Sequence, residues 1–115
     1  MRVKRGVKAR RRRNKVLDRA EGYRGSGSRV FSVAKEMNDR GMVFAYRDRK
    51  QRKREFRKLW ITRISAAAKQ NGTSYSKLMG ALTSSKINLD RKVLSDMAIF
   101  DPEAFTQIVQ QVLPK

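Results

Sequence analysis

The sequence has 115 residues, the usual size of one domain, and carries 29 Lys and Arg against 10 Asp and Glu, a formal net charge of +19. Such an excess of positive charge opposes compaction unless a polyanion neutralises it, so nucleic acid is the expected partner. The chain contains no Cys and no His, which excludes disulfides, a thiol nucleophile, an imidazole base and a Cys/His zinc site. We therefore expect neither an enzyme nor a bound metal or other cofactor. The short apolar runs predict no signal peptide and no membrane span, hence an intracellular, soluble protein.

The charge is unevenly distributed along the chain. Residues 1–58 hold 22 Lys and Arg and 6 acidic residues, whereas residues 59–115 hold 7 and 4. We expect residues 1–58 to form a basic extension that binds the polyanion, and residues 59–115 to form a compact C-terminal helical domain. No strand-like alternation bounded by turn pairs occurs, so the predicted fold class is all-α.

The basic extension begins with a tail, residues 1–15, that contains no acidic residue. We expect this tail to be disordered when free and to order on phosphates. Helices are predicted at about residues 7–21, ended by Gly22, at 28–40, ended by Gly41, and at about 42–70, a stretch without Gly or Pro. In the joint EGYRGSGSRVF, residues 21–31, Tyr23 either stacks on an unpaired base or packs on a neighbouring element.

The segment YRDRKQRKREFRK, residues 46–58, combines eight basic residues with two acidic ones. At 100° per residue the basic side chains point to every side of a helix, and like charges such as Lys50 and Arg54 stand four residues apart. A helix that reads one DNA groove usually concentrates its basic residues on one face. This pattern therefore indicates a helix surrounded by RNA phosphates rather than one laid in a groove.

The C-terminal part predicts three short amphipathic helices. They begin at Tyr75 after the stop signal Asn71-Gly72, after the N-cap Asp90, and at Asp101-Pro102-Glu103, where a cap precedes a proline at the first helical position. Their apolar stripes are interpreted as the core of a small bundle. The second half of the preceding helix carries Phe56, Trp60, Ile64 and Ala67 at the spacing expected of residues that dock on this bundle.

Several motifs in order resemble a known family. They are RVKRGV at residue 2, GYRG at 22, SRVF at 28, AYRDRKQRKREFRKLWITRI at 45, NGTSYSKLM at 71 and LDRKVLSDMA at 89. Together they resemble the bacterial-type ribosomal protein L-twenty family of the large subunit, over nearly the whole chain. The resemblance implies an all-α protein with a long basic helical extension threaded through 23S-type ribosomal RNA and a C-terminal helical domain on an RNA junction.

The resemblance also implies ribosomal RNA contacts at matched positions. In the extension these are Arg2, Lys4, Arg5, Lys8, Arg10, Arg11, Arg12, Arg13, Lys15, Tyr23, Arg24, Arg29, Arg47, Arg49, Lys50, Arg52, Lys53, Arg54, Arg57, Lys58 and Arg63. In the C-terminal domain they are Lys69, Ser74, Ser76, Lys77, Lys86, Arg91 and Lys92. No catalytic residue and no metal ligand is implied.

The function expected from this resemblance is that of a structural constituent of the large ribosomal subunit that promotes early assembly. Its partners would be large-subunit ribosomal RNA and neighbouring ribosomal proteins, in the cytoplasm if the ribosome is bacterial or in an organelle otherwise. Repression of its own messenger RNA through the C-terminal domain is a further role that the family implies for some bacteria. The alternative is a histone-like DNA-compacting protein, which would explain the charge but not the C-terminal motifs.

Overall fold

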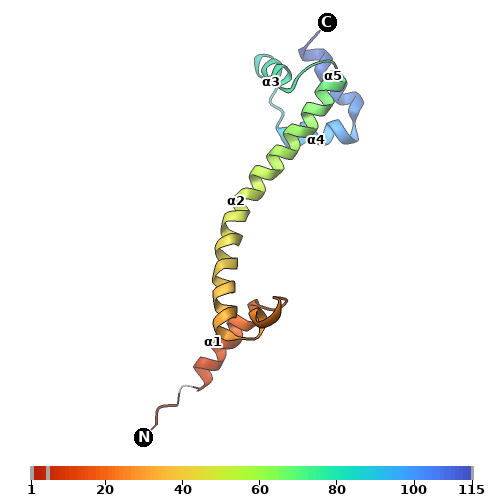
Figure 1. The fold of residues 1–115 in the computed structure, drawn as a ribbon. Coiled ribbons are helices and arrows are strands. Elements are labelled where there is room, and N and C mark those ends of the chain that lie inside the picture. The colour runs from red at the N-terminus through yellow and green to blue at the C-terminus, as the bar shows by residue number, and fades with distance from the viewer. Residues whose placement is uncertain (1, 5, 115) are drawn as a thin grey trace. The chain divides into compact units, whose positions relative to one another are not determined.

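The computed structural model describes residues 2–4 and 6–114, so Arg5, one of the predicted RNA-contacting residues, lies outside the described residues. The elements in chain order are α1 (Gly6–Arg19), the 3-10 turn η1 (Gly25–Ser28), α2 (Phe31–Gln70), α3 (Tyr75–Ser84), α4 (Arg91–Phe100) and α5 (Pro102–Val112) (Figure 1). No strand occurs among the described residues, and the predicted all-α fold with a long basic helix and a small C-terminal bundle is confirmed. Within the same residues, no helix has the length and apolar character needed to span a membrane.

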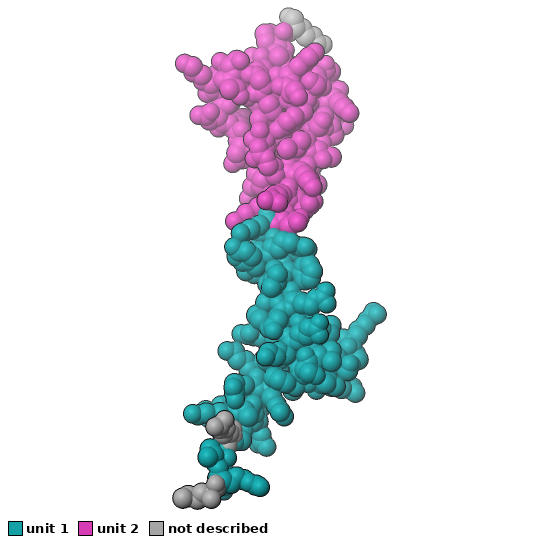
Figure 2. Space-filling view, turned by 60° about the vertical axis from the view of Figure 1, so that its left-hand side comes forward, with its two compact units in different colours: residues 1–50 teal, residues 51–115 magenta. Residues whose placement is uncertain are grey.

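The chain forms two compact units, unit 1 (Met1–Lys50) and unit 2 (Gln51–Lys115), and the helix α2 contributes its first half to unit 1 and its second half to unit 2 (Figure 2). Unit 1 also contains α1 and η1, and unit 2 also contains α3, α4 and α5.

The helices of unit 2 begin where the sequence predicts, because each has a side-chain cap. The Ser74 hydroxyl accepts a hydrogen bond from the Lys77 N–H at 3.4 Å and caps α3. The Asp90 carboxylate accepts one from the Val93 N–H at 2.8 Å and caps α4. Asp101 does the same for α5, with Pro102 at the first helical position. Each cap satisfies an N–H that the helix itself leaves without a partner.

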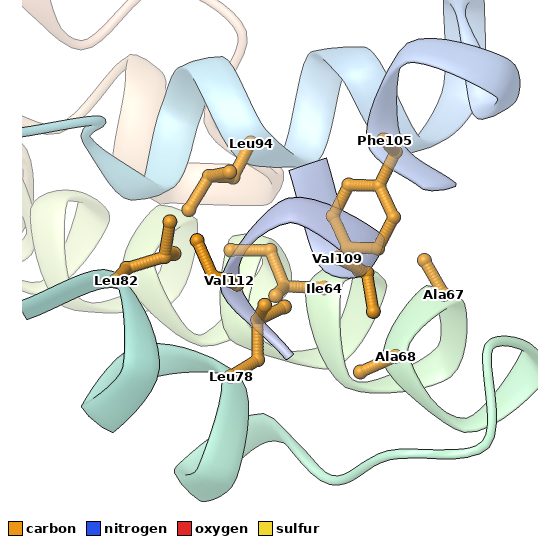
Figure 3. Close-up of a cluster of buried hydrophobic side chains, with 9 residues drawn as sticks. All are labelled: Ile64, Ala67, Ala68, Leu78, Leu82, Leu94, Phe105, Val109 and Val112. Atoms are coloured by element: carbon orange, nitrogen blue, oxygen red, sulfur yellow. The ribbon is translucent and has the colours of Figure 1, made fainter. Parts of the chain in front are cut away.

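The core of unit 2 is a cluster of apolar side chains that point toward one another from all four helices (Figure 3). It consists of Ile64, Ala67 and Ala68 from α2, Leu78 and Leu82 from α3, Leu94 from α4, and Phe105, Val109 and Val112 from α5. The predicted docking of Ile64 and Ala67 is thus confirmed. The prediction for Phe56 is wrong, because Phe56 is 48% exposed and the burial of α2 against the bundle begins only at the half-buried Trp60.

The helices α2 and α3 end in the same hydrogen-bonded motif, with a left-handed residue just beyond the last turn. After α2, Gly72 has φ +77° and the Thr73 N–H donates to the Ala68 carbonyl at 3.0 Å, as the stop signal Asn71-Gly72 predicts. After α3, the Ile87 N–H donates to the Leu82 carbonyl at 3.0 Å, but the left-handed position is held by Lys86, with φ 57°. A residue with a Cβ is strained in this conformation, which glycine adopts freely.

Replacing Lys86 by glycine is therefore expected to raise the free energy of unfolding by about 0.5–1 kcal/mol, since it removes this strain. Chemical unfolding of the full chain followed by the emission of Trp60 measures the effect. Lys86→Ala is the matched control, because it removes the same charge and keeps the Cβ. Equal stability of the glycine and alanine variants would show that the left-handed backbone is not strained.

Unit 1 is built where α1 and the joint after it meet the first turns of α2. The helix α1 ends at Arg19, slightly before the predicted Glu21, and the chain turns through Gly22, which has φ +89°. Gly27 is buried, and a Cβ at this position would lie 2.5 Å from the Met37 sulfur. The joint therefore packs on α2, and a larger residue at position 27 would require the flexible Met37 side chain to move.

The predicted helix at residues 28–40 is wrong at both ends. Ser28 belongs to η1, in which Ser28 Oγ donates to the Gly25 carbonyl at 3.2 Å, and α2 begins only at Phe31. At the other end, α2 runs through Gly41 without interruption. A Cβ on Gly41 would lie 3.1 Å from the Tyr23 hydroxyl, so glycine serves close packing here and not helix termination. One glycine inside a helix costs about 1 kcal/mol relative to alanine. This cost is small beside the stabilisation that the other residues of the 40-residue helix provide.

Candidate nucleic-acid interface

The basic segment of α2, residues 46–58, is exposed at every position. Only two ion pairs form among the described residues, between Arg47 and Asp48 at 3.1 Å and between Lys58 and Glu55 at 3.2 Å. Both pairs are exposed, and such pairs contribute at most about 1 kcal/mol. The six other basic residues of the segment have no carboxylate partner among residues 2–4 and 6–114. They are Arg49, Lys50, Arg52, Lys53, Arg54 and Arg57. Their charge is available to an external polyanion.

Aromatic rings alternate with basic side chains on α2 within unit 1. The Arg47 guanidinium lies 4.6 Å from the centroid of the Phe44 ring. The Lys50 ammonium lies 4.2 Å from the centroid of the Tyr46 ring and donates a hydrogen bond to the Tyr46 hydroxyl at 2.8 Å. Both rings are exposed. Cations beside accessible aromatic faces are typical of surfaces that bind single-stranded nucleic acid by stacking and charge.

A basic pocket of about 570 Å³ lies between α1 and the start of α2, wholly within unit 1. It is lined by Ala9, Arg12, Arg13, Lys15, Val16, Arg19, Phe31 and Lys35. The Arg13 guanidinium lies 5.6 Å from the centroid of the Phe31 ring, so these two lining side chains contact each other across the two helices. Five cations and no carboxylate line this pocket, and such a lining suits phosphate groups.

The other predicted residues of unit 1 are distributed over its surface. Arg2 and Lys4 precede the first helix and are exposed, and Arg24 and Arg29 flank η1 and are exposed. Lys8, Arg10 and Arg11 are exposed on α1. Tyr23 is half-buried against Gly27 and Gly41, which is the packing arrangement of the two alternatives that the sequence left open.

The residues predicted in the C-terminal domain are exposed, with one exception. Lys69, Ser76, Lys77, Lys86 and Lys92 are exposed, and so is Ser74, whose hydroxyl is engaged in the α3 cap. Arg91 is half-buried, and its Nε donates to the Tyr75 hydroxyl at 2.8 Å, joining the start of α4 to the start of α3. Arg91 therefore has an internal role as well as donors left for an external acceptor.

A groove of about 580 Å³ lies between α2 and α4 within unit 2. Its lining is Arg52, Lys53, Phe56, Leu59, Trp60, Arg63, Lys92 and Asp96. The rings of Phe56 and Trp60 stand with their centroids 6.3 Å apart and their planes tilted by 33°. Four of the predicted basic residues thus meet around an aromatic pair.

The acidic residues do not assemble into a site of the kind that binds metals. Among residues 2–4 and 6–114, no group of three or more His, Cys, Asp or Glu side chains is placed to hold a metal ion. Four of the acids act as caps or ion-pair partners: Asp90 and Asp101 cap helices, and Asp48 and Glu55 pair with basic side chains. The functional groups that cluster on the described surface are basic side chains and aromatic rings.

Comparison with known proteins agrees with this surface. The model of the family described as Ribosomal protein L20 matches residues 2–108. The chain belongs to this family. "Large ribosomal subunit protein bL20" of Desulforapulum autotrophicum is 58% identical over 108 residues, covering 94% of this chain and 93% of the relative. The protein of the same name from Desulfotalea psychrophila is 59% identical over 107 residues (93% and 91%), and that of Roseiflexus sp. is 54% identical over 110 residues (96% and 94%).

The region matched by the L20 family includes the basic segment, the unit 1 pocket and the unit 2 groove. Three charged residues of these two hollows were not among the predicted site residues, namely Arg19, Lys35 and Asp96. Arg19 had a detectable signal, because Arg12, Lys15 and Arg19 share one face of α1 at helical spacing. Lys35 and Asp96 had none, since each reaches its hollow from a second helix.

Proposed function

We propose that this chain is a structural, non-catalytic constituent of the large ribosomal subunit that binds 23S-type ribosomal RNA directly and promotes early subunit assembly. The observation that carries the proposal is the set of exposed basic side chains along residues 46–58, six of which have no carboxylate partner among the described residues. In water these charges repel one another, and phosphates on several sides relieve the repulsion. The names of the relatives, large ribosomal subunit proteins from bacteria, support this reading and favour a cytoplasmic ribosome.

In this proposal residues 1–58 thread between RNA segments and residues 59–115 fold as a domain on the RNA surface beside neighbouring ribosomal proteins. The RNA contacts are the residues named from the family resemblance, together with Arg19 and Lys35 in the unit 1 pocket. The pocket supports this extension of the set, because both side chains line it with Arg12, Arg13 and Lys15.

Binding of the full chain to a large-subunit ribosomal RNA transcript, measured over a series of salt concentrations, tests the proposal. We expect the logarithm of affinity to fall linearly with the logarithm of salt, with a steep slope set by the number of phosphates contacted. Duplex DNA of equal length is the competitor. RNA should remain bound at a salt concentration that releases the DNA, whereas tighter binding to the duplex would favour the DNA-compacting alternative. Sedimentation of the chain with large subunits from a cell extract is the second expected result.

We propose a second role, repression of the chain's own messenger RNA through the C-terminal domain. The observation that favours it is the separate core of unit 2, which leaves Lys69, Lys77, Lys86 and Lys92 exposed around it. Translation of that messenger in a cell-free extract should fall when the full chain is added, and a messenger with an unrelated leader should be unaffected. Equal translation of both messengers at every dose would remove this role.

A further inference from the structure

The groove between α2 and α4 of unit 2 differs from the rest of the basic surface because large apolar side chains line it together with the basic ones. Its α2 wall is one helix face, on which Arg52, Phe56, Leu59 and Arg63 recur at spacings of three and four residues. Phe56 and Leu59 remain 48% and 40% exposed in it, although both are large and apolar. The volume of about 580 Å³ lies within the usual range of small-ligand sites. An open aromatic floor of this size is suited to a flat ring.

Four cations line the groove together with the aromatic pair; they are called the rim cations below. Arg52, Lys53 and Arg63 come from α2 and Lys92 from α4, and none of them takes part in an ion pair within the described residues. Four cations beside an aromatic floor match a nucleotide, whose base is flat and apolar on its faces and whose phosphates are anionic. An apolar protein segment would leave these four charges without partners.

A single carboxylate, that of Asp96, also lines the groove, and it is half-buried. A carboxylate only accepts hydrogen bonds, so it selects for a base edge that donates them. Guanine offers two neighbouring donors on its Watson–Crick edge, N1–H and the N2 amino group. Uracil offers one N–H between two carbonyl oxygens, which a carboxylate would repel. The carboxylate therefore favours guanine over uracil, a preference that stacking alone does not provide.

We infer that this groove receives one unpaired guanine of the RNA, stacked on the Phe56–Trp60 pair, with its donor edge on Asp96. The neighbouring phosphates bind the rim cations Arg52, Lys53, Arg63 and Lys92. The inference rests on the proposed RNA-binding function and adds to it a subsite that distinguishes one base from another.

The experiment uses the full chain and three short oligouridylates, which differ only at the central position: guanosine, uridine or an abasic sugar. Trp60 is the one tryptophan of the sequence, so its emission reports on the groove directly. We expect the guanosine probe to bind about tenfold or more tighter than the abasic probe, and to quench Trp60 on binding. The uridine probe should bind between the two.

Two substitutions in the groove separate its parts. Affinities of the variants are measured by the fluorescence anisotropy of end-labelled probes, because Trp60→Leu has no tryptophan. This variant should lose the advantage of guanosine over the abasic probe, while affinity for the abasic probe, which depends on phosphates, stays within about twofold. Asp96→Asn should bring guanosine and uridine affinities together while both remain above the abasic probe. Since Trp60 is half-buried, Phe56→Leu at the exposed edge of the floor serves as a second stacking variant, and unfolding of each variant is measured.

Matched controls lie on the same unit outside the groove. Phe100→Leu changes an aromatic residue that is 81% exposed, and Glu103→Gln removes one exposed negative charge. Both should keep the guanosine preference. Equal affinity of the wild-type chain for all three probes, with steep salt dependence retained, would overturn the guanine subsite and leave RNA binding intact. Failure of the chain to bind any RNA would instead overturn the proposed function. Quenching of Trp60 by an acidic peptide and not by the guanosine probe would assign the groove to a protein partner and overturn the inference.

Discussion

Replacing Phe105 by alanine is expected to lower the free energy of unfolding of unit 2 by about 3–5 kcal/mol. Phe105 is 1% exposed and packs among Ile64, Val109 and the other core residues, so its removal leaves a cavity that these side chains fill only in part. A domain of this size is stabilised by about 5–10 kcal/mol, and the loss is therefore a large share of the total. Chemical unfolding followed by Trp60 emission and by helical ellipticity measures it.

Phe100→Ala is the matched control for this substitution. It deletes the same ring from α4, where the side chain is 81% exposed, and should change the free energy of unfolding by no more than about 0.5 kcal/mol. Similar losses for the two phenylalanines would contradict the placement of Phe105 in the core. A large loss for Phe100 alone would show that its ring packs inside the folded unit.

The second large effect concerns ribosomal RNA affinity. Replacing Arg49, Arg54 and Arg57 together by glutamine is expected to lower the affinity of the full chain about a hundredfold or more near 0.1 M salt. Each phosphate contact contributes about 0.7–0.9 to the salt slope, so three lost contacts should reduce it by about 2–3. None of the three side chains has an ion-pair partner in the part of the chain that the structure describes, so folding should be little affected.

The control for this variant is the replacement of the same three residues by lysine, which retains the charge. Its salt slope should equal that of the wild type, and its affinity should fall only through lost forked contacts. An unchanged slope in the glutamine variant would mean that these arginines face solvent in the complex. Ellipticity of both variants without RNA shows whether α2 has been altered.

Local signals predicted most of unit 2. A cap such as Asp101 before Pro102, or the apolar stripe through Phe105 and Val109, acts within one or two turns, and the sequence displays those turns directly. The roles of the glycines were harder to predict, because glycine can either end a helix or allow a neighbouring side chain to pack closely against the backbone. Gly72 of unit 2 does the first, with φ +77°, and Gly41 of unit 1 does the second, beside the Tyr23 hydroxyl.

The sequence predicted which basic residues form the candidate interface, but it did not predict the two hollows that these residues line. The basic residues of α1 and α2 are visible in the sequence, and their excess over acids predicts a polyanion partner. The two hollows depend on which helices meet. The groove of unit 2 needs Lys92 and Asp96 of α4 beside Trp60 of α2, a juxtaposition of residues some thirty positions apart that no periodicity encodes.

The placement of Phe105, Val109 and Val112 on the last helix affects how the chain matures during synthesis. Residues emerge from the synthesising ribosome in order, and segments made first become available first. The basic residues of α1 and α2 therefore leave the ribosome while Ile64 and Leu78 still lack the α5 side of their cluster. Capture by a polyanion can thus precede closure of the core, and the growing chain need not wait for a finished bundle before it is recruited.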